Sequence, residues 1–186
     1  MSQSNVHNEL LIERCRKGDQ KAQMAVYKAY YAAMYNTAVR IVKDPYEAED
    51  VMQESFLAAF TKIDSFKGEV TFGAWLKRIV INNSIQHYRK KQKANEIPLD
   101  VVEYRVEDQE GFVPDHELTN IKAQKVLQTM KMLKDNYRVA LTLFLIEGYD
   151  YEEISEIMDI SYANCRTTIS RAKEKLRQNL NAMAYE

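Results

Sequence analysis

Short polar and cationic side chains recur along one side of a segment near the end of the chain, from Ser161 to Arg177. Serine, threonine and arginine donate hydrogen bonds to base edges and phosphates, so these types in this pattern suit DNA. The candidate DNA-contacting residues are Ala163, Arg166, Thr167, Ser170, Arg171 and Lys175. The opposite side is apolar at helical spacing, with Cys165, Ile169, Ala172 and Leu176. A basic surface helix that is merely solvated is the alternative.

A second helix must hold this one in place, and the residues just before it predict such a helix. Asp150 and Glu153 have the spacing of a capping box, in which each side chain accepts a hydrogen bond from the other residue's backbone amide. The apolar face of this helix is Ile154, Ile157 and Met158. Asp159 and Ile160 form a tight turn, and Ser161 is a good N-cap for the next helix. The segment therefore predicts a helix-turn-helix, which favours DNA binding.

A different surface is predicted on a helix from Tyr46 to about Ile63, which begins at the signal Asp44-Pro45. Its expected core side consists of Ala48, Val51, Met52, Ser55, Ala59 and Ile63. The other side carries Asp50, Gln53, Glu54 and Leu57. Their spacing of i, i+3, i+4 and i+7 makes one continuous exposed patch. The patch is either a solvated face with a stray leucine or a docking site for a protein partner.

A long helix from about Thr71 to Lys93 carries a second candidate nucleic-acid surface. Its expected core stripe is Phe72, Trp75, Leu76 and Ile79. Another side carries Arg78, Asn82, Gln86, Arg89 and Lys93, a mixture of cations and amides that suits phosphate contacts with a few base contacts. Phe66, in the preceding loop, either anchors that loop or offers its ring to an unstacked base.

Composition indicates an all-α protein, because 186 residues include only five glycines and three prolines while 46% are hydrophobic. No apolar run approaches the roughly 18 residues of a membrane span, and Met1 to His7 lack signal-peptide character, so we expect a cytoplasmic chain without direct membrane insertion. The two cysteines are expected to be reduced. The three histidines are scattered without ligand spacing, so neither a metal nor another cofactor is expected.

Charge is segregated along the chain although the formal net charge is only -1. Residues 77–93 hold six cations and no acid, and residues 162–177 hold five cations and one acid. Residues 94–117 between them hold eight acids, one arginine and two of the prolines. This pattern predicts two small helical domains, 7–93 and 118–184, joined by an acidic flexible linker over 94–117.

Several of these segments resemble a known family. Residues 49–56, Glu-Asp-Val-Met-Gln-Glu-Ser-Phe, are similar to the Glu-Asp-x-x-Gln-Glu-x-Phe signature of bacterial sigma factors. Residues 72–82 resemble the Trp-Leu-x-x-Ile-x-x-Asn helix of these proteins, and residues 151–158 and 171–177 resemble their final helix-turn-helix. With little beyond regions 2 and 4, the chain resembles the extracytoplasmic-function type (ECF, group 4).

The resemblance implies a promoter-specificity subunit that binds core RNA polymerase and directs initiation at a stress- or envelope-responsive regulon. Asp50, Gln53, Glu54 and Leu57 would dock on the clamp helices of the largest polymerase subunit, and other contacts would reach the flap of the second subunit. Region 2 would face the minus-ten element through Phe66, Arg78, Asn82, Gln86 and Arg89, with Phe66 and Asn82 receiving a flipped base. The helix-turn-helix would read the minus-thirty-five element. An anti-sigma factor is a further expected partner, and the acidic linker would mimic RNA in a polymerase channel.

Two other classes of function compete with this interpretation. A helix-turn-helix repressor or activator would bind DNA without docking on polymerase. An enzyme with a small-molecule substrate is not expected, because the chain shows no nucleophile–base pair, phosphate loop or metal spacing. The sequence also departs from the common family pattern, since Tyr162-Ala163-Asn164-Cys165 stands where Val-Gly-Thr-Val is frequent and Gln86 where Asp is frequent. These departures leave the promoter sequence open.

Overall fold

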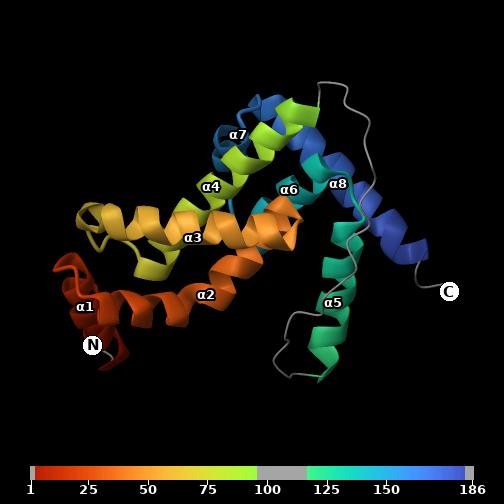
Figure 1. Ribbon diagram of the computed structural model, residues 1–186. Coiled ribbons are helices and arrows are strands. Elements are labelled where there is room, and N and C mark those ends of the chain that lie inside the picture. The colour runs from red at the N-terminus through yellow and green to blue at the C-terminus, as the bar shows by residue number, and fades with distance from the viewer. Residues whose placement is uncertain (1–2, 96–116, 183–186) are drawn as a thin grey trace. The chain divides into compact units, whose positions relative to one another are not determined.

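The computed structural model describes residues 3–95 and 117–182, and every regular element in these ranges is helical (Figure 1). The expected all-α class is therefore confirmed. The chain divides into two compact units, Met1–Glu96 and Ile97–Glu186. Of the predicted linker, residues 96–116 lie outside the described residues, while Ala94 and Asn95 continue the helix that was expected to stop at Lys93.

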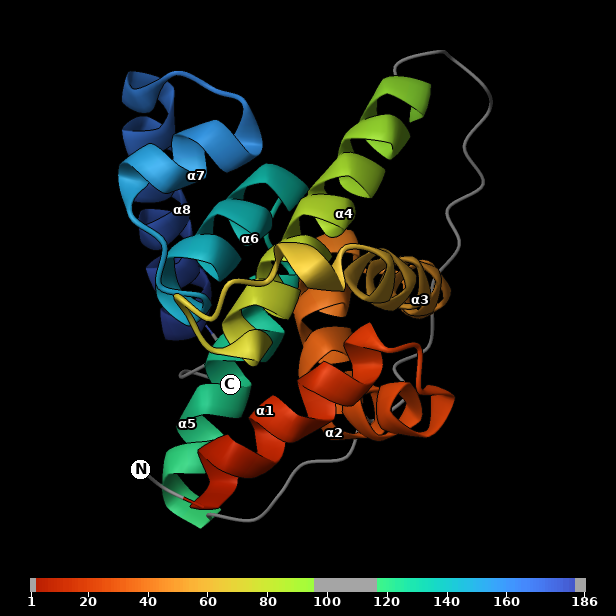
Figure 2. The same ribbon diagram turned by 90° about the vertical axis from the view of Figure 1, so that its left-hand side faces the viewer.

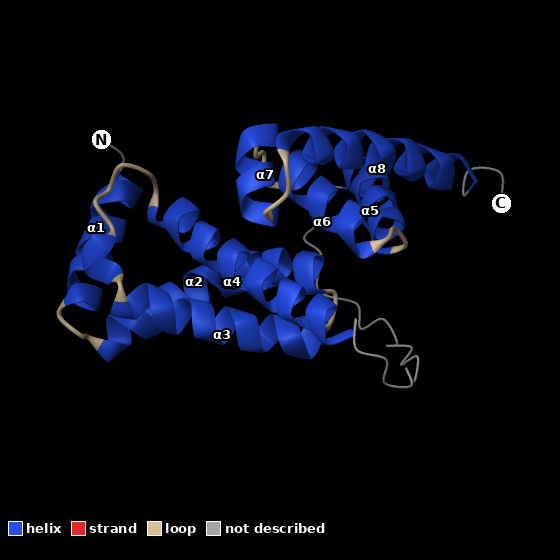
Figure 3. Ribbon diagram, turned by 90° about the horizontal axis from the view of Figure 1, so that it is seen from above, coloured by secondary structure: helices blue, strands red, loops and turns tan. Residues whose placement is uncertain are grey.

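Unit 1 contains α1 (Gln3–Arg16), α2 (Gln20–Val42), α3 (Pro45–Thr61), the short 3-10 turn η1 (Ile63–Ser65) and α4 (Phe72–Asn95). Helices α2, α3 and α4 pack on one another, and α1 packs on α2 (Figure 3). Local signals set where these helices begin. The Asp44 carboxylate accepts hydrogen bonds from the backbone N–H groups of Tyr46 (2.8 Å) and Glu47 (3.0 Å), and Asp19 caps α2 in the same way.

The core of unit 1 lies between these helices. All six residues expected on the core side of the Tyr46–Ile63 segment are buried. For α4, Phe72 and Leu76 are buried as expected, but Trp75 and Ile79 are only half-buried. The buried side of α4 continues instead through Val80, Ile81, Ser84 and Ile85. All four residues of the expected stripe therefore contact the core, while the contacts with α2 and α3 extend the buried face to residues that the stripe did not include.

Unit 2 contains α5 (Glu117–Lys131), α6 (Asp135–Leu141), the π-helical turn η2 (Thr142–Ile146), α7 (Tyr151–Met158) and α8 (Tyr162–Ala182). Helices α5, α6 and α7 each pack against α8, and Figure 2 shows α7 lying against it. The expected stripe Cys165, Ile169, Ala172 and Leu176 is buried. Helix α8 is thus held along one side by three other helices.

The predicted helix-turn-helix is present in α7 and α8. The capping box is complete, because Glu153 N–H donates to Asp150 Oδ1 (2.8 Å) and Asp150 N–H donates to Glu153 Oε2 (3.0 Å). Asp159 ends α7 in the left-handed conformation with φ 54°, and Ser161 Oγ accepts a hydrogen bond from Asn164 N–H (3.2 Å). The turn is therefore closed by backbone hydrogen bonds at the end of α7 and by the Ser161 side chain at the start of α8.

Replacing Asp150 with alanine is expected to lower the free energy of unfolding of unit 2 by about 1 kcal/mol, because the backbone N–H of Glu153 in the first turn of α7 loses its acceptor. Denaturant unfolding, monitored through hydrogen exchange of the backbone amides of α7, would measure this loss of stability. Glu156→Ala, which removes an exposed acid from the same helix, is the matched control and should stay within about 0.5 kcal/mol. Equal effects from the two variants would mean that the capping box does not stabilise α7.

Candidate partner and nucleic-acid interfaces

The α3 patch, defined as Asp50, Gln53, Glu54 and Leu57, lies on the exposed side of α3. The Leu57 side chain is 70% exposed, although the opposite side of α3 is packed in the core. The Gln53 amide is oriented by a hydrogen bond, which its Nε2 donates to Glu49 Oε1 (3.2 Å). The patch therefore combines two carboxylates, an oriented amide and an apolar side chain on one stable helix.

Phe66 is half-buried and packs on the first turn of α4. Its ring centroid lies 5.5 Å from that of Phe72 in an edge-to-face arrangement, and 5.5 Å from that of Trp75. Its carbonyl oxygen accepts a hydrogen bond from Arg16 Nη2 (2.6 Å). Phe66 thus anchors the loop before α4, and a role in receiving a base stays a prediction.

The other minus-ten candidates lie on α4. Arg78, Asn82 and Gln86 are exposed, while Arg89 is half-buried. Their spacing of four places the first three along one side of the helix. The buried side of α4 packs in the core of unit 1, so the helix is already formed before nucleic acid binds. Arg78, Asn82 and Gln86 can therefore contact a nucleic-acid strand without a folding step.

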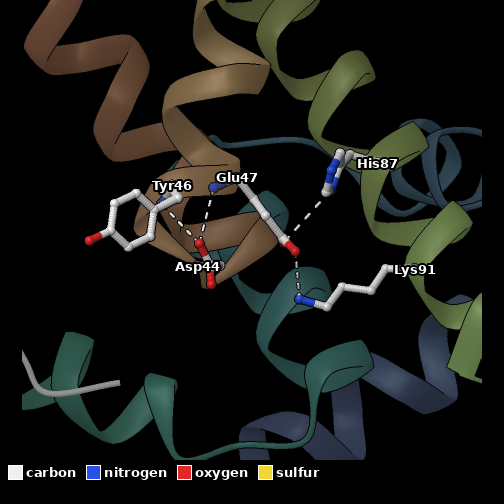
Figure 4. A network of polar contacts seen from close by, with 5 residues as sticks. All are labelled: Asp44, Tyr46, Glu47, His87 and Lys91. Carbon is white, nitrogen blue, oxygen red and sulfur yellow. Dashed lines mark hydrogen bonds and ion pairs between the residues drawn. The ribbon is translucent and has the colours of Figure 1, made fainter. Parts of the chain in front are cut away.

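Sequence reasoning missed an acid from α3 that contacts the C-terminal half of α4. Glu47 Oε1 accepts a hydrogen bond from Lys91 Nζ (2.8 Å), and Glu47 Oε2 lies 3.8 Å from His87 Nδ1 (Figure 4). The basic stretch 77–93 carries no acid of its own, yet the fold partly neutralises it at Lys91. Tyr46, whose backbone shares the Asp44 cap with Glu47, turns its ring away from this network (Figure 4).

The candidate DNA face of α8 is exposed along its whole length. All six of its residues, Ala163, Arg166, Thr167, Ser170, Arg171 and Lys175, are exposed. The Thr167 hydroxyl donates to the Ala163 carbonyl oxygen (2.9 Å), which leaves the oxygen lone pairs of the hydroxyl as acceptors. Tyr137 of α6 joins Ser170, Arg171 and Lys175 in lining a shallow hollow that also includes Glu174 and Gln178. Sequence reasoning did not find Tyr137, because only the packing of α6 on α8 brings it there.

A row of aromatic rings crosses the helix-turn-helix. Phe144 of η2 stacks on Tyr151 of α7 (5.2 Å between centroids), and Tyr151 meets Tyr162 of α8 edge-on (6.4 Å). Lys173 Nζ lies 3.9 Å from the Phe144 centroid, and the Arg166 guanidinium lies 6.0 Å from the Tyr162 centroid. These contacts tie η2, α7 and α8 together and hold Arg166 near the start of α8. They too were not expected from the sequence.

The fold and these surfaces define a helical DNA-binding protein with a second exposed surface suited to a protein partner. Family models match twice: Sigma-70 region 2 over residues 26–94 and Sigma-70, region 4 over residues 123–176. The chain belongs to the ECF sigma factors of RNA polymerase. Such a protein directs promoter-specific transcription initiation. The sigma factor family is not known as catalytic.

Individual relatives agree with the family models over nearly the whole chain. The RNA polymerase sigma-H factor of Pseudomonas aeruginosa is 32% identical over 190 residues, covering 96% of this chain and 96% of that protein. The ECF RNA polymerase sigma factor SigW of Bacillus subtilis is 33% identical over 180 residues, covering 91% and 94%.

Solved structures share the fold. The sigma factor RpoE from Bartonella quintana, solved in complex with the anti-sigma factor NepR, matches with a TM-score of 0.59 and 23% identity. That match covers 85% of this chain and 96% of the other. CnrH, solved in complex with the cytosolic domain of CnrY, matches with a TM-score of 0.52 and 22% identity over 93% and 96%. Within the described residues of this chain, no helix has the length and apolar character needed to cross a membrane.

Proposed function

We propose that unit 1 docks on core RNA polymerase through the α3 patch, on the clamp helices of the largest subunit. The observation that supports this most strongly is the composition of an exposed helical face. A 70% exposed leucine lies beside Asp50, Gln53 and Glu54 on a helix whose opposite side is fully buried. Acceptor groups around an apolar centre suit a partner that offers cations around an apolar surface. A further contact is proposed with the flap of the second polymerase subunit.

Promoter DNA is proposed to bind along two helices. In region 2, assigned to residues 7–93, Arg78, Asn82, Gln86 and Arg89 of α4 contact the minus-ten element. Phe66 together with Asn82 receives a flipped base. In region 4, assigned to residues 118–184, the exposed face of α8 enters the major groove at the minus-thirty-five element. The exposure of Arg78, Asn82 and Gln86 on α4, and of the candidate DNA face of α8, supports this division. So does the overlap of the two family-model matches with these ranges.

The regulatory setting is proposed from the family. The chain acts in the cytoplasm, without chemistry of its own, at stress- or envelope-responsive promoters. An anti-sigma factor holds it inactive, a proposal supported by the similar structure of the sigma factor RpoE in complex with the anti-sigma factor NepR.

Reconstitution with purified core RNA polymerase tests the docking and initiation steps together. The full chain should confer transcription from a small set of start sites, mapped first in cells that overexpress it. A stand-alone repressor or activator would instead bind the same duplex tightly without polymerase and leave core polymerase unable to initiate. That second result would overturn the proposed docking.

Arg171→Ala is expected to lower transcription from promoters that depend on the minus-thirty-five element, through lost base or phosphate contacts costing roughly 1–3 kcal/mol. Run-off transcription on promoters with and without that element measures the effect. Lys122→Ala is the control, since it removes one exposed cation from α5 in the same unit and leaves the candidate face of α8 unchanged. Equal activity of Arg171→Ala on all promoters would remove this residue from the interface.

A further inference from the structure

Three side chains form a continuous series of hydrogen bonds from half-buried Tyr31 on α2 to the α3 patch. The Tyr31 hydroxyl, on α2, donates to Glu49 Oε2 at 2.9 Å. Glu49 Oε1 in turn accepts from Gln53 Nε2 at 3.2 Å. Each oxygen of the Glu49 carboxylate thus has its own donor, one from each helix. A patch residue is therefore tied through Glu49 to a side chain on another helix.

The inner end of this series is held firmly. The Tyr31 ring stacks on Tyr35 (6.0 Å between centroids, 4° between planes) and is tilted against Tyr27 at 5.5 Å. Tyr27 itself packs on Phe56 at 4.8 Å, so the row of tyrosines is fixed to the α3 side of the core. The hydrogen bond to Glu49, followed by burial, raises the pKa of Tyr31 to about 12. The hydroxyl therefore stays protonated at neutral pH and donates a hydrogen bond to Glu49.

The outer end of the series decides how Gln53 presents its amide. An ionised carboxylate only accepts hydrogen bonds, so the amide nitrogen of Gln53 must point toward Glu49. The amide oxygen then points away from Glu49. Asp50 and Glu54 add carboxylate oxygens on the same exposed side. The polar part of the patch becomes a surface of acceptors.

We propose that Tyr31 and Glu49 are positioning residues that fix Gln53, so that the α3 patch offers a preorganised set of acceptors to cationic donors on its partner. The inference rests on the proposed docking of this patch on core polymerase. Fixing a glutamine before binding removes part of the rotamer entropy that the complex would otherwise lose. Neither Tyr31 nor Glu49 needs to touch the partner for this effect.

Tyr31→Phe in the full chain tests the positioning role, because it removes the hydroxyl and keeps the ring. Affinity for purified core polymerase is expected to fall roughly three- to tenfold, the scale of one hydrogen bond. Tyr35→Phe is the matched control, since this neighbouring half-buried tyrosine stacks on Tyr31 and has no hydrogen bond to Glu49 in the described part of the chain. Its affinity should be unchanged. Equal losses from the two variants would overturn the proposal.

A double-mutant cycle separates positioning from general stability. In a Gln53→Ala background, Tyr31→Phe should cause no further loss of affinity, because the amide that Tyr31 positions is gone. The same loss in both backgrounds would overturn positioning while leaving docking intact. Full affinity in Gln53→Ala and in the double change of Asp50 and Gln53 to alanine would overturn the docking assignment itself.

Discussion

Replacing Asp50 and Gln53 together with alanine is expected to weaken binding to core RNA polymerase roughly 10- to 100-fold, with the fold intact. Both side chains are exposed on α3, so their removal leaves no cavity, and the Glu49 carboxylate that loses its hydrogen bond from Gln53 is only half-buried. Truncation at the centre of an interface commonly costs about 1–3 kcal/mol, and each 1.4 kcal/mol is a tenfold change in affinity. Equilibrium binding of labelled chain to core polymerase, alongside thermal unfolding, measures the two quantities separately.

The matched control changes the same residue types at Gln20 and Asp64. Both are exposed in unit 1 and lie outside α3. Alanine at these two positions alters charge and amide content equally and should leave polymerase affinity unchanged. If both double variants lose affinity alike, net charge would explain the effect and the α3 patch would not be the docking site.

Leu76→Ala is expected to lower the free energy of unfolding of unit 1 by about 2–5 kcal/mol. Leu76 is 0% exposed in the core formed with α2 and α3, and truncation there removes apolar contacts and leaves a cavity. Denaturant unfolding followed by tryptophan fluorescence reports on this unit, because the only tryptophan of the chain, Trp75, is the neighbouring residue.

Leu57→Ala supplies the control for this prediction, since the same substitution at a 70% exposed position should change stability by no more than about 0.5 kcal/mol. The two substitutions should then separate the stability of unit 1 from its affinity for polymerase. Leu76→Ala lowers stability, whereas Leu57→Ala lowers affinity for polymerase. A small stability change at Leu76 would mean that the core repacks around the missing side chain.

Local signals in the sequence predicted much of this fold. Asp44 with Pro45, and Asp150 with Glu153, begin helices through contacts within four residues, so their effect does not depend on the rest of the chain. Helical periodicity separated the buried side of α3 from the exposed α3 patch for a similar reason. Residues three or four apart share a face wherever a helix forms. The exposed sides of α3 and α8 could therefore be predicted, while their roles at a partner stay predictions.

Other features depend on contacts between distant residues and could not be predicted. Glu47 and Lys91 are 44 residues apart, and only the packing of α3 on α4 joins them. The buried side of α4 includes Val80, Ile81 and Ser84, which the expected stripe did not contain, for the same reason. The π-helical turn Thr142–Ile146 shifts the hydrogen-bond pattern to i,i+5, with Glu147 N–H donating to Thr142 O at 3.1 Å, and no pattern of residue types indicated it.

The sequence by itself determined where α3 and α7 begin and which side chains of α3 and α8 face outward, because capping and periodicity act within one or two turns. Only the tertiary structure decided how those outward side chains are supported. Tyr31 reaches Gln53 through Glu49, Phe66 rests on Phe72 and Trp75, and Arg166 lies by Tyr162 at the end of an aromatic row. The contact of Tyr31 with Glu49 joins α2 to α3, that of Phe66 joins a loop to α4, and the aromatic row beneath Arg166 joins η2, α7 and α8. Their geometry is set by helix packing, which short-range sequence patterns do not encode.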